Sequence, residues 1–345
     1  MYTEPPKKLL IMYILDVLRR YSDADHRLSQ MDIIDILQKE FDMSADRKAV
    51  KRNLMNLKEF GYNLECSETV RRNKNGEEEI IYTDWYLERD FSDAELRLLI
   101  DSLLFSKHIP YSQCKELIDK IEGLSNCYFK SKVRHVHNLP DNQPKNAELF
   151  YNIEILDEAI ERNRKVVFYY GDYGTDNRLH LRKDEDGEPK EYLINPYQMV
   201  AANGRYYLIA NIEKYDNLSH YRVDHIRNIR ILDEPAKTQR KVEGLENGLN
   251  LPKHMAEHIY MFSGKSEKVT MRTTPNMVGD IIDWFGGDVR FSDETDDSIQ
   301  VHVTANLHAM RFWALQYAPY VTILSPQSLI DDVKQDLKDA MEKYG

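Results

Sequence analysis

Cysteines and long apolar segments are both scarce in this sequence. Only three cysteines occur among 345 residues (Cys66, Cys114 and Cys127), and no two of them form a CxxC pair. This number and spacing argue against a disulfide framework and against a thiolate zinc site, and they favour the cytoplasm as the compartment. No run approaches the roughly 18 consecutive apolar residues that a membrane-spanning helix needs, so we expect no membrane partner.

The N-terminus has only part of the pattern of a secretion signal. Two lysines precede an apolar patch, but Asp16, Arg19 and Arg20 interrupt that patch at helical spacing. No small-residue cleavage site follows. We therefore interpret residues 7–21 as an amphipathic helix.

Motifs of the common enzyme classes are largely missing. GxxxxGKS/T, GxGxxG and GxSxG do not occur, so nucleotide hydrolysis and ester hydrolysis lack a starting motif. The exception is the HxxEH pattern of His254, Glu257 and His258, because a helix would place both histidines on one face with Glu257 as a base. That segment is short, follows Pro252 and has no evident third ligand. We predict no enzyme, no catalytic or metal-binding residue and no cofactor, with a zinc-dependent hydrolase as an alternative.

Positive charge is concentrated locally on a chain that is acidic overall. The formal net charge is −11, which argues against indiscriminate binding to nucleic acid. Between Ser44 and Gly76, however, eight Lys or Arg residues stand against four acids, a local balance of +4. A basic module on an acidic chain can bind a polyanion on one face while the rest stays soluble.

The basic segment has the pattern of a helix-turn-helix. Apolar periodicity and the N-cap residue Ser29 predict helices over residues 7–21, 31–41 and 45–60, with a turn at 42–44. In the third helix Val50, Leu54 and Leu57 form the buried stripe, which leaves the cations facing solvent. A helix, a short turn and a cationic helix form the arrangement whose second helix enters the major groove of DNA.

A hairpin follows the third helix. Two β-rich runs, residues 62–72 and 79–87, flank a turn at 73–76, and cations gather at its tip. After a helix-turn-helix, such a hairpin is the expected wing of a winged helix. The predicted DNA contacts are Arg47, Lys48, Lys51, Arg52 and Asn53 on the helix, with Arg71, Arg72 and Lys74 on flanking phosphate.

Residues 91–132 are predicted to form helices, capped at Ser92 and Ser112. Leu96, Leu99 and Leu103 belong to an apolar face wide enough to suggest a partner helix. Packing within the chain and dimerisation both explain such a face, and the sequence leaves the choice open.

The central part of the chain is predicted to be a small barrel. A helix at 147–162 precedes about five short strands, a mixture that favours an Sm-like or SH3-like barrel over a parallel sheet. Asn203-Gly204 is a strong hairpin signal because both residues tolerate positive φ. Aromatics and cations then follow closely, which is typical of a receptor for an anionic, base-bearing ligand.

The C-terminal part alternates helices and strands. After a linker, residues 265–345 predict the order β-α-β-β-α-β plus a final helix, which is the ferredoxin-like pattern. The fold class is therefore α+β and multidomain. The expected domains are a winged helix-turn-helix (1–90), a helical connector (91–145), a barrel (146–235), a linker (236–264) and the ferredoxin-like extension (265–345).

Residues 195–226 resemble a WYL domain, which is named for Trp-Tyr-Leu on a barrel strand. The corresponding residues are Tyr206-Tyr207-Leu208. Upstream Asn195-Pro196-Tyr197 agrees, and downstream Tyr221-Arg222-Val223-Asp224-His225-Ile226 fits the family's aromatic-Arg pair followed by an acid. Tyr206 replaces the name-giving Trp, and His225 stands where the family often has Arg. The ligand of this chain therefore need not be the ligand of other members.

The N-terminal part resembles the winged helix of bacterial regulators that carry a WYL domain. Ser44, Arg47-Lys48, Arg52-Asn53-Leu54 and Leu57 match the usual recognition helix. The resemblance implies a homodimeric, ligand-responsive transcriptional regulator that binds a double-stranded DNA operator.

The resemblance also implies that the barrel senses an anionic effector, such as single-stranded nucleic acid or a nucleotide, and thereby modulates operator binding. The predicted effector residues are Tyr206, Tyr207, Arg222, His225 and Arg227. Two alternatives remain: the zinc hydrolase, and a nucleic-acid-binding accessory factor that does not regulate transcription.

Overall fold

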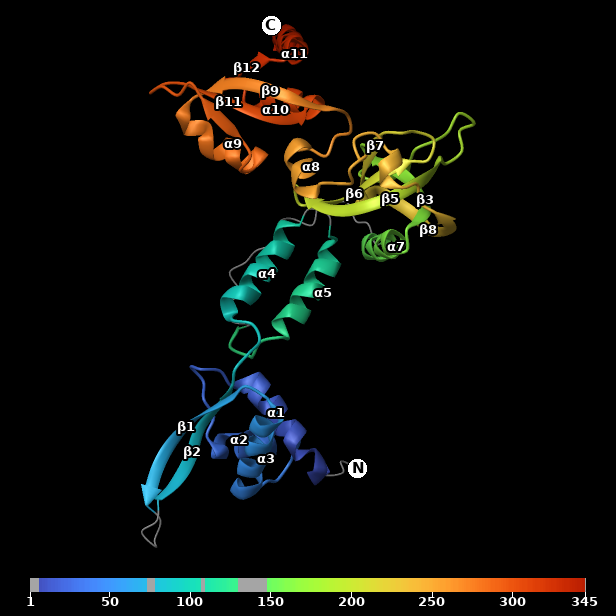
Figure 1. Cartoon of the computed structure of the whole chain (residues 1–345). Helices are drawn as coiled ribbons and strands as arrows, with labels where there is room; N and C mark the ends of the chain where they lie inside the picture. Colours follow the sequence, from blue (N-terminus) through green and yellow to red (C-terminus); the bar gives the residue numbers. More distant parts are fainter. Residues whose placement is uncertain (1–5, 73–77, 107–108, 130–147, 345) are drawn as a thin grey trace. The chain divides into compact units, whose positions relative to one another are not determined.

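The computed structural model of the chain describes residues 6–72, 78–106, 109–129 and 148–344. The chain divides into two compact units, Met1–Gln143 and Pro144–Gly345 (Figure 1). Both contain helices and sheets, so the expectation of a mixed α+β, multidomain chain is confirmed.

The first unit begins with three helices and a two-stranded sheet. After a 3₁₀ turn at Lys7–Leu9 the elements are α1 (Leu10–Tyr21), α2 (Gln30–Phe41), α3 (Arg47–Phe60), β1 (Leu64–Arg72), β2 (Glu78–Leu87), α4 (Asp93–Phe105) and α5 (Tyr111–Glu122). Ser29 forms a capping box with Asp32 at the start of α2, as the sequence indicated. The third helix begins slightly later than predicted, because the Asp46 side chain accepts the Ala49 N–H and acts as the N-cap.

The core of this unit is built from one face of each helix and from the base of the hairpin. Trp85 on β2 is completely buried and pairs through its backbone with Leu28 ahead of α2. The core consists of Ile14, Leu15, Val17, Leu18, Ile33, Leu37, Val50, Leu54, Leu57, Leu64, Trp85 and Leu87. The predicted stripe of α3 therefore points inward, which fixes its cationic face outward.

The helices α4 and α5 pack against each other over a small core of their own. Leu96, Ile100 and Phe129 are buried in it. Leu98 and Leu99, on another side of α4, remain 67% and 42% exposed. One part of the predicted apolar face of α4 is therefore buried against α5. Another part of it stays exposed within the described chain.

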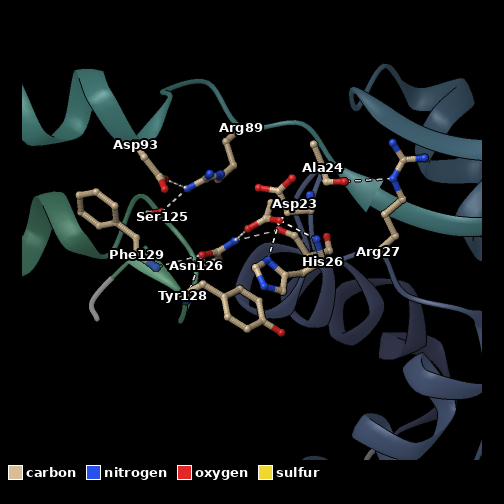
Figure 2. A network of polar contacts seen from close by, with 12 residues as sticks. Asp23, Ala24, His26, Arg27, Arg89, Asp93, Ser125, Asn126, Tyr128 and Phe129 are labelled. Atoms are coloured by element: carbon tan, nitrogen blue, oxygen red, sulfur yellow. Dashed lines mark hydrogen bonds and ion pairs between the residues drawn. The ribbon is translucent and has the colours of Figure 1, made fainter. Parts of the chain in front are cut away.

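A polar cluster ties the segment after α5 to the loop between α1 and α2 (Figure 2). The Asn126 side chain is almost fully buried and donates to the Asp23 carboxylate at 2.6 Å and to the Ser22 carbonyl at 3.2 Å. Asp23 also accepts the His26 N–H at 2.7 Å, and the His26 ring stacks on Tyr128 at a centroid distance of 3.6 Å. We call these five residues the Asn126 joint.

Hydrogen bonds reinforce the Asn126 joint on both sides. Asn126 Oδ1 accepts the backbone N–H groups of Tyr128 and Phe129, and the Cys127 N–H donates to the Arg20 carbonyl at 3.0 Å. Burial opposes ionisation of Asp23, but the donors Asn126 and His26 outweigh it and lower the pKa of this carboxyl. The carboxylate therefore stays charged at neutral pH and holds the loop to the helical hairpin.

The second unit carries two sheets. Its elements are α7 (Leu149–Glu161), β3 (Arg164–Tyr173), β4 (Leu179–Leu181), β5 (Glu191–Ala202), β6 (Arg205–Ile212), β7 (Leu218–Arg222), β8 (Ile226–Pro235), α8 (Leu251–Glu257), β9 (Ser266–Thr273), α9 (Val278–Phe285), β10 (Arg290–Ser292), β11 (Ile299–Asn306), α10 (Leu307–Gln316), β12 (Thr322–Ser325) and α11 (Gln327–Tyr344). Short 3₁₀ turns lie at Val223–His225, Gln239–Lys241 and Pro275–Met277. None of the helices in the described part of the chain is long and apolar enough to cross a membrane.

The first sheet of this unit is not closed into a barrel within the described residues, so the expected Sm-like or SH3-like barrel is not confirmed. Its strand order is β4-β3-β5-β6-β7, with β8 pairing to β3. Closure would need a ladder between β7 and β8, but the 3₁₀ turn at Val223–His225 separates them and β8 pairs along β3 instead. The Asn203-Gly204 hairpin joins β5 to β6 as expected, with positive φ at both residues.

The second sheet has the antiparallel order β10-β11-β9-β12. Its elements follow the predicted sequence β-α-β-β-α-β with a final helix. Trp313 on α10 and Met271 on β9 are fully buried between sheet and helices, together with Phe285 of α9. This region has an independent core and lies C-terminal to the segment that carries the candidate effector residues.

Candidate nucleic-acid interface and effector site

The outward face of α3 carries exposed cations. Arg47, Lys48 and Arg52 are all exposed, while the opposite side of the helix is buried in the core. The backbone N–H of Ala49 donates to Asp46 and lowers the pKa of that carboxyl, which keeps the N-cap charged and the first turn ordered. The three predicted cations are therefore presented on an ordered helix.

Two other predicted residues of α3 are engaged within the protein. Lys51 is half-buried, with its ammonium 5.6 Å from the centre of the Tyr82 ring on β2. The Asn53 amide donates to the Ala49 carbonyl at 2.8 Å. Asn56, one turn beyond Arg52, is exposed and was missed by the sequence reasoning. Its position opposite the Val50 stripe was the available signal.

The hairpin presents two of its three predicted cations. Arg71 and Arg72 at the end of β1 are exposed, and Arg72 lies 3.9 Å from Glu78 across the ladder. Lys74 lies outside the described residues. An ion pair at that distance and exposure contributes little, so both guanidinium groups are accessible to a polyanion.

The register of the open sheet separates the two candidate tyrosines. Tyr207 on β6 lies directly opposite Arg222 on β7, whereas Tyr206 lies opposite Ala201 on β5. Directly opposed residues share a face of the sheet. The structure therefore brings Tyr207, and not Tyr206, to Arg222.

Arg222 is held by an acid two residues away. Its guanidinium forms two hydrogen bonds with the Asp224 carboxylate, at 3.1 and 2.6 Å. Burial raises the cost of ionising Asp224, but the hydrogen bonds from Arg222 outweigh it and lower the pKa of that carboxyl. Arg227 donates to the carbonyls of Asp224 and Ile226, so it also folds over this turn.

His225 is buried beneath the same turn. Its Nδ1 donates to the Gly171 carbonyl at 2.8 Å, and its ring packs against Tyr170 and Tyr173. Burial, and then the nearby Arg222, lower the pKa of His225, so the ring is neutral at neutral pH. Its Nε2 is buried and has no hydrogen-bond partner within the described chain. Because Nδ1 is the donor, this nitrogen is an unused acceptor.

Several residues of this region were missed by the sequence reasoning. Arg182 lies over the Tyr170 ring at 5.0 Å, and Lys190 lies over Tyr192 at 5.2 Å. Tyr170 also accepts the Arg222 backbone N–H at 3.1 Å. The sequence reasoning predicted short strands here and assigned no role to the β3 tyrosines or to the cations of the following loop. Their pairing depends on contacts between β3 and the following loop.

The HxxEH histidines make contacts with a third histidine. His254 Nε2 lies 2.8 Å from His220 Nε2 on β7, and the His258 ring stacks on His254 at 4.1 Å. Burial lowers the pKa of His220 to about 3 and that of His254 to about 4. Within the described residues, no group of three or more His, Cys, Asp or Glu side chains is arranged to hold a metal ion. The zinc-hydrolase alternative therefore gains no support from the geometry.

A separate hollow of about 830 Å³ lies between the end of α7, β5 and the segment after β8. It is lined in part by Tyr197, Lys237 and Arg240. The Lys237 ammonium is engaged by Asp216 at 2.7 Å, and Tyr197 donates to the Lys237 carbonyl. None of the predicted effector residues lines this hollow.

Family models match two parts of the chain. Residues 151–231 match the WYL domain, and residues 265–341 match the WCX domain. The resemblance to a WYL domain stated above is confirmed over that span. Tyr206, Tyr207, Arg222, His225 and Arg227 all lie within it.

The similarities to complete proteins are distant. No curated protein matches the chain. The solved structures include Proteasome accessory factor B/C (PafBC) of Arthrobacter aurescens, at 14% identity and a TM-score of 0.29, with 97% of this chain and 48% of that chain covered. They also include a CRISPR Cas-related protein, at 12% identity and a TM-score of 0.38, with 100% of this chain and 88% of that chain covered. The chain spans about half the length of PafBC.

Proposed function

We propose that the chain is a DNA-binding transcriptional regulator whose WYL region senses an anionic, nucleic-acid-like effector and changes how tightly the protein binds its operator. In this proposal residues 1–90 are the winged helix-turn-helix and residues 91–145 a connector. Residues 146–235 are the sensor, residues 236–264 a linker and residues 265–345 the C-terminal extension. We place its action on double-stranded DNA in the cytoplasm.

The observation that carries the DNA-binding part is the outward face of α3. Arg47, Lys48 and Arg52 are exposed on a helix whose other side is anchored in the core. Arg71 and Arg72 on the hairpin add exposed cations within the same unit. On a chain with a net charge of −11, a confined basic face favours one orientation for binding DNA.

The sensing part is supported by the WYL match and by the cluster around Arg222. Two arginines, a neutral histidine with an unused acceptor and Tyr207 lie near one turn. Guanidinium groups bind phosphate in a forked geometry, and an aromatic face stacks on a base. The Asp224 carboxylate already forms an ion pair with the Arg222 guanidinium. An anionic effector that binds Arg222 therefore has to displace this carboxylate.

The homodimer is part of the proposal. The exposed Leu98 and Leu99 on α4 are suited to pack on a second copy, because two helices can share such an apolar strip. A dimer would offer two recognition helices to two half-sites. Sedimentation of the full chain measures this directly, and a monomer at micromolar concentration would contradict it.

The test uses a footprint on the DNA upstream of the chain's own coding region, with and without short single-stranded oligonucleotides. Arg52→Ala is expected to weaken operator binding roughly tenfold while effector binding remains, and Arg222→Ala is expected to do the reverse. Lys58→Ala is the matched control, because Lys58 is an exposed cation of α3 that lies off the Lys48–Arg52 stripe.

A palindromic footprint that responds to the oligonucleotide supports the regulator. Equal losses for Arg52→Ala and Lys58→Ala would contradict the assigned face of α3. Sequence-independent protection would instead favour the accessory factor.

A further inference from the structure

The exposure of its side chains narrows the set of α3 residues that can contact DNA bases. Lys48, Arg52 and Asn56 are spaced by four residues and all three are exposed, so they form one stripe along the helix. The buried residues Val50 and Leu54 lie on the opposite side. A helix anchored in this way turns the Lys48–Asn56 stripe away from the core, so this stripe can enter a groove.

The neighbouring polar residues are directed elsewhere. The Asn53 amide is hydrogen-bonded to the Ala49 carbonyl at 2.8 Å, and Lys51 is half-buried above the Tyr82 ring. By contrast, neither the Arg52 nor the Asn56 side chain forms a hydrogen bond to another group of the described chain. The donors and acceptors of these two side chains are therefore free for a ligand.

We propose that Arg52 and Asn56 read bases directly, with Arg52 contacting a guanine and Asn56 an adenine in the major groove. The inference rests on the proposed DNA-binding function and extends it to the residues that set sequence preference. An Arg guanidinium matches the O6 and N7 acceptors of guanine, and an Asn amide matches the N6 donor and N7 acceptor of adenine. Lys48, nearer the N-terminus, has three donors and no acceptor and contacts phosphate or guanine.

The spacing of the two residues sets the spacing of the two bases. Four helical residues rise by about 6 Å, and successive bases along a strand are about 3.4 Å apart. A helix lying along the groove therefore brings Arg52 and Asn56 to positions about two base pairs apart. The half-site is expected to contain a guanine and an adenine at that separation.

The experiment is selection from a random-sequence duplex DNA library by the full-length chain and three variants. Wild type is expected to enrich a motif with guanine and adenine about two base pairs apart. Asn56→Ala is expected to reduce the adenine preference by at least about fivefold and to keep the guanine, and Arg52→Ala is expected to do the opposite. Lys58→Ala, at an exposed cation of α3 off this stripe, is the matched control, and its motif is expected to equal that of the wild type.

The outcomes separate the inference from the function on which it rests. If the wild type enriches no motif, the proposed operator binding fails and the readout fails with it. If the wild type enriches a motif that Asn56→Ala preserves, the readout is overturned while DNA binding stands. Loss of the adenine in Lys58→Ala would also overturn it. Thermal unfolding of each variant verifies that the exposed substitutions leave the fold intact.

Discussion

Asn53 and Asn56 on α3 mark how far sequence reasoning reaches at the scale of single residues. Periodicity correctly identified Val50, Leu54 and Leu57 as buried, because apolar spacing is a local property. It did not separate two asparagines three residues apart, since the bond from Asn53 to the Ala49 carbonyl depends on side-chain geometry. The same holds for the ion pair between Arg222 and Asp224, which depends on how the two side chains fold over the turn.

Substitution of Asp224 tests the state of Arg222. Asp224→Asn removes the carboxylate that holds Arg222, and we expect the chain to bind a labelled single-stranded oligonucleotide about fivefold more tightly, because a charge-assisted bond within the protein is weakened by roughly 1 kcal/mol. Fluorescence anisotropy at fixed salt measures the change. Asp176→Asn, at an exposed acid on the loop before β4, controls for the loss of one negative charge. Equal tightening in both variants, or weaker binding in Asp224→Asn, would refute the role of the ion pair.

At the scale of elements, local sequence signals predicted the helices and strands but did not predict which distant segments pair. The order of helices and strands in the second unit followed from caps, turns and apolar periods. Closure of the expected small barrel could not be judged from the sequence, because it depends on which strand pairs with β8, and nothing local in the sequence distinguishes β7 from β3 as its partner. The Asn126 joint was likewise invisible, since its two sides are about a hundred residues apart in the chain.

The Asn126 joint carries the prediction at this scale. Asn126→Ala removes the donor to Asp23 and the side-chain acceptor of the Tyr128 N–H, while the Phe129 N–H keeps the backbone carbonyl of residue 126. The loss is expected to destabilise the contact by roughly 1–3 kcal/mol. Amide hydrogen exchange should accelerate at His26 and at residues 127–129, while the amides of α3 keep their protection. Gln38→Ala is the control, because it removes an exposed hydrogen bond from the Gln38 amide to the Asp42 carboxylate at the end of α2. Unchanged exchange at residues 127–129 would show that the Asn126 joint does not stabilise this segment.

At the scale of the whole molecule, the histidine cluster ties the segment after the WYL region to its sheet. His220 belongs to β7 and His254 to α8, and both imidazoles are kept neutral chiefly by burial. In the unfolded chain their pKa returns to about 6.5, so protons bind the unfolded state first. Their contribution to stability is therefore complete above about pH 6.5 and is lost as the pH falls toward 4.

Acid unfolding measures this contribution. At pH 5 each of the two imidazoles is expected to lower the free energy of unfolding by roughly 2 kcal/mol relative to neutral pH. The midpoint of urea unfolding of the second unit, followed by fluorescence of Trp284 and Trp313 in a full-length Trp85→Phe variant, should fall between pH 7 and pH 5. His220→Gln with His254→Gln keeps polar groups in place without a titratable ring, and it should reduce the fall. An equally steep fall in the double variant would assign the acid sensitivity to other groups.

The environments of the cysteines allow the Asn126 joint to be observed without engineering. Cys114 is buried and Cys66 half-buried, and burial raises the pKa of both thiols, so both react slowly at neutral pH. Cys127 is exposed, and its own N–H forms one of the bonds between the helical hairpin and α1. An environment-sensitive dye attached to the native chain under mild conditions will therefore label this one position first. The protein thus contains its own attachment point for following, in real time, whether DNA or an effector loosens that contact.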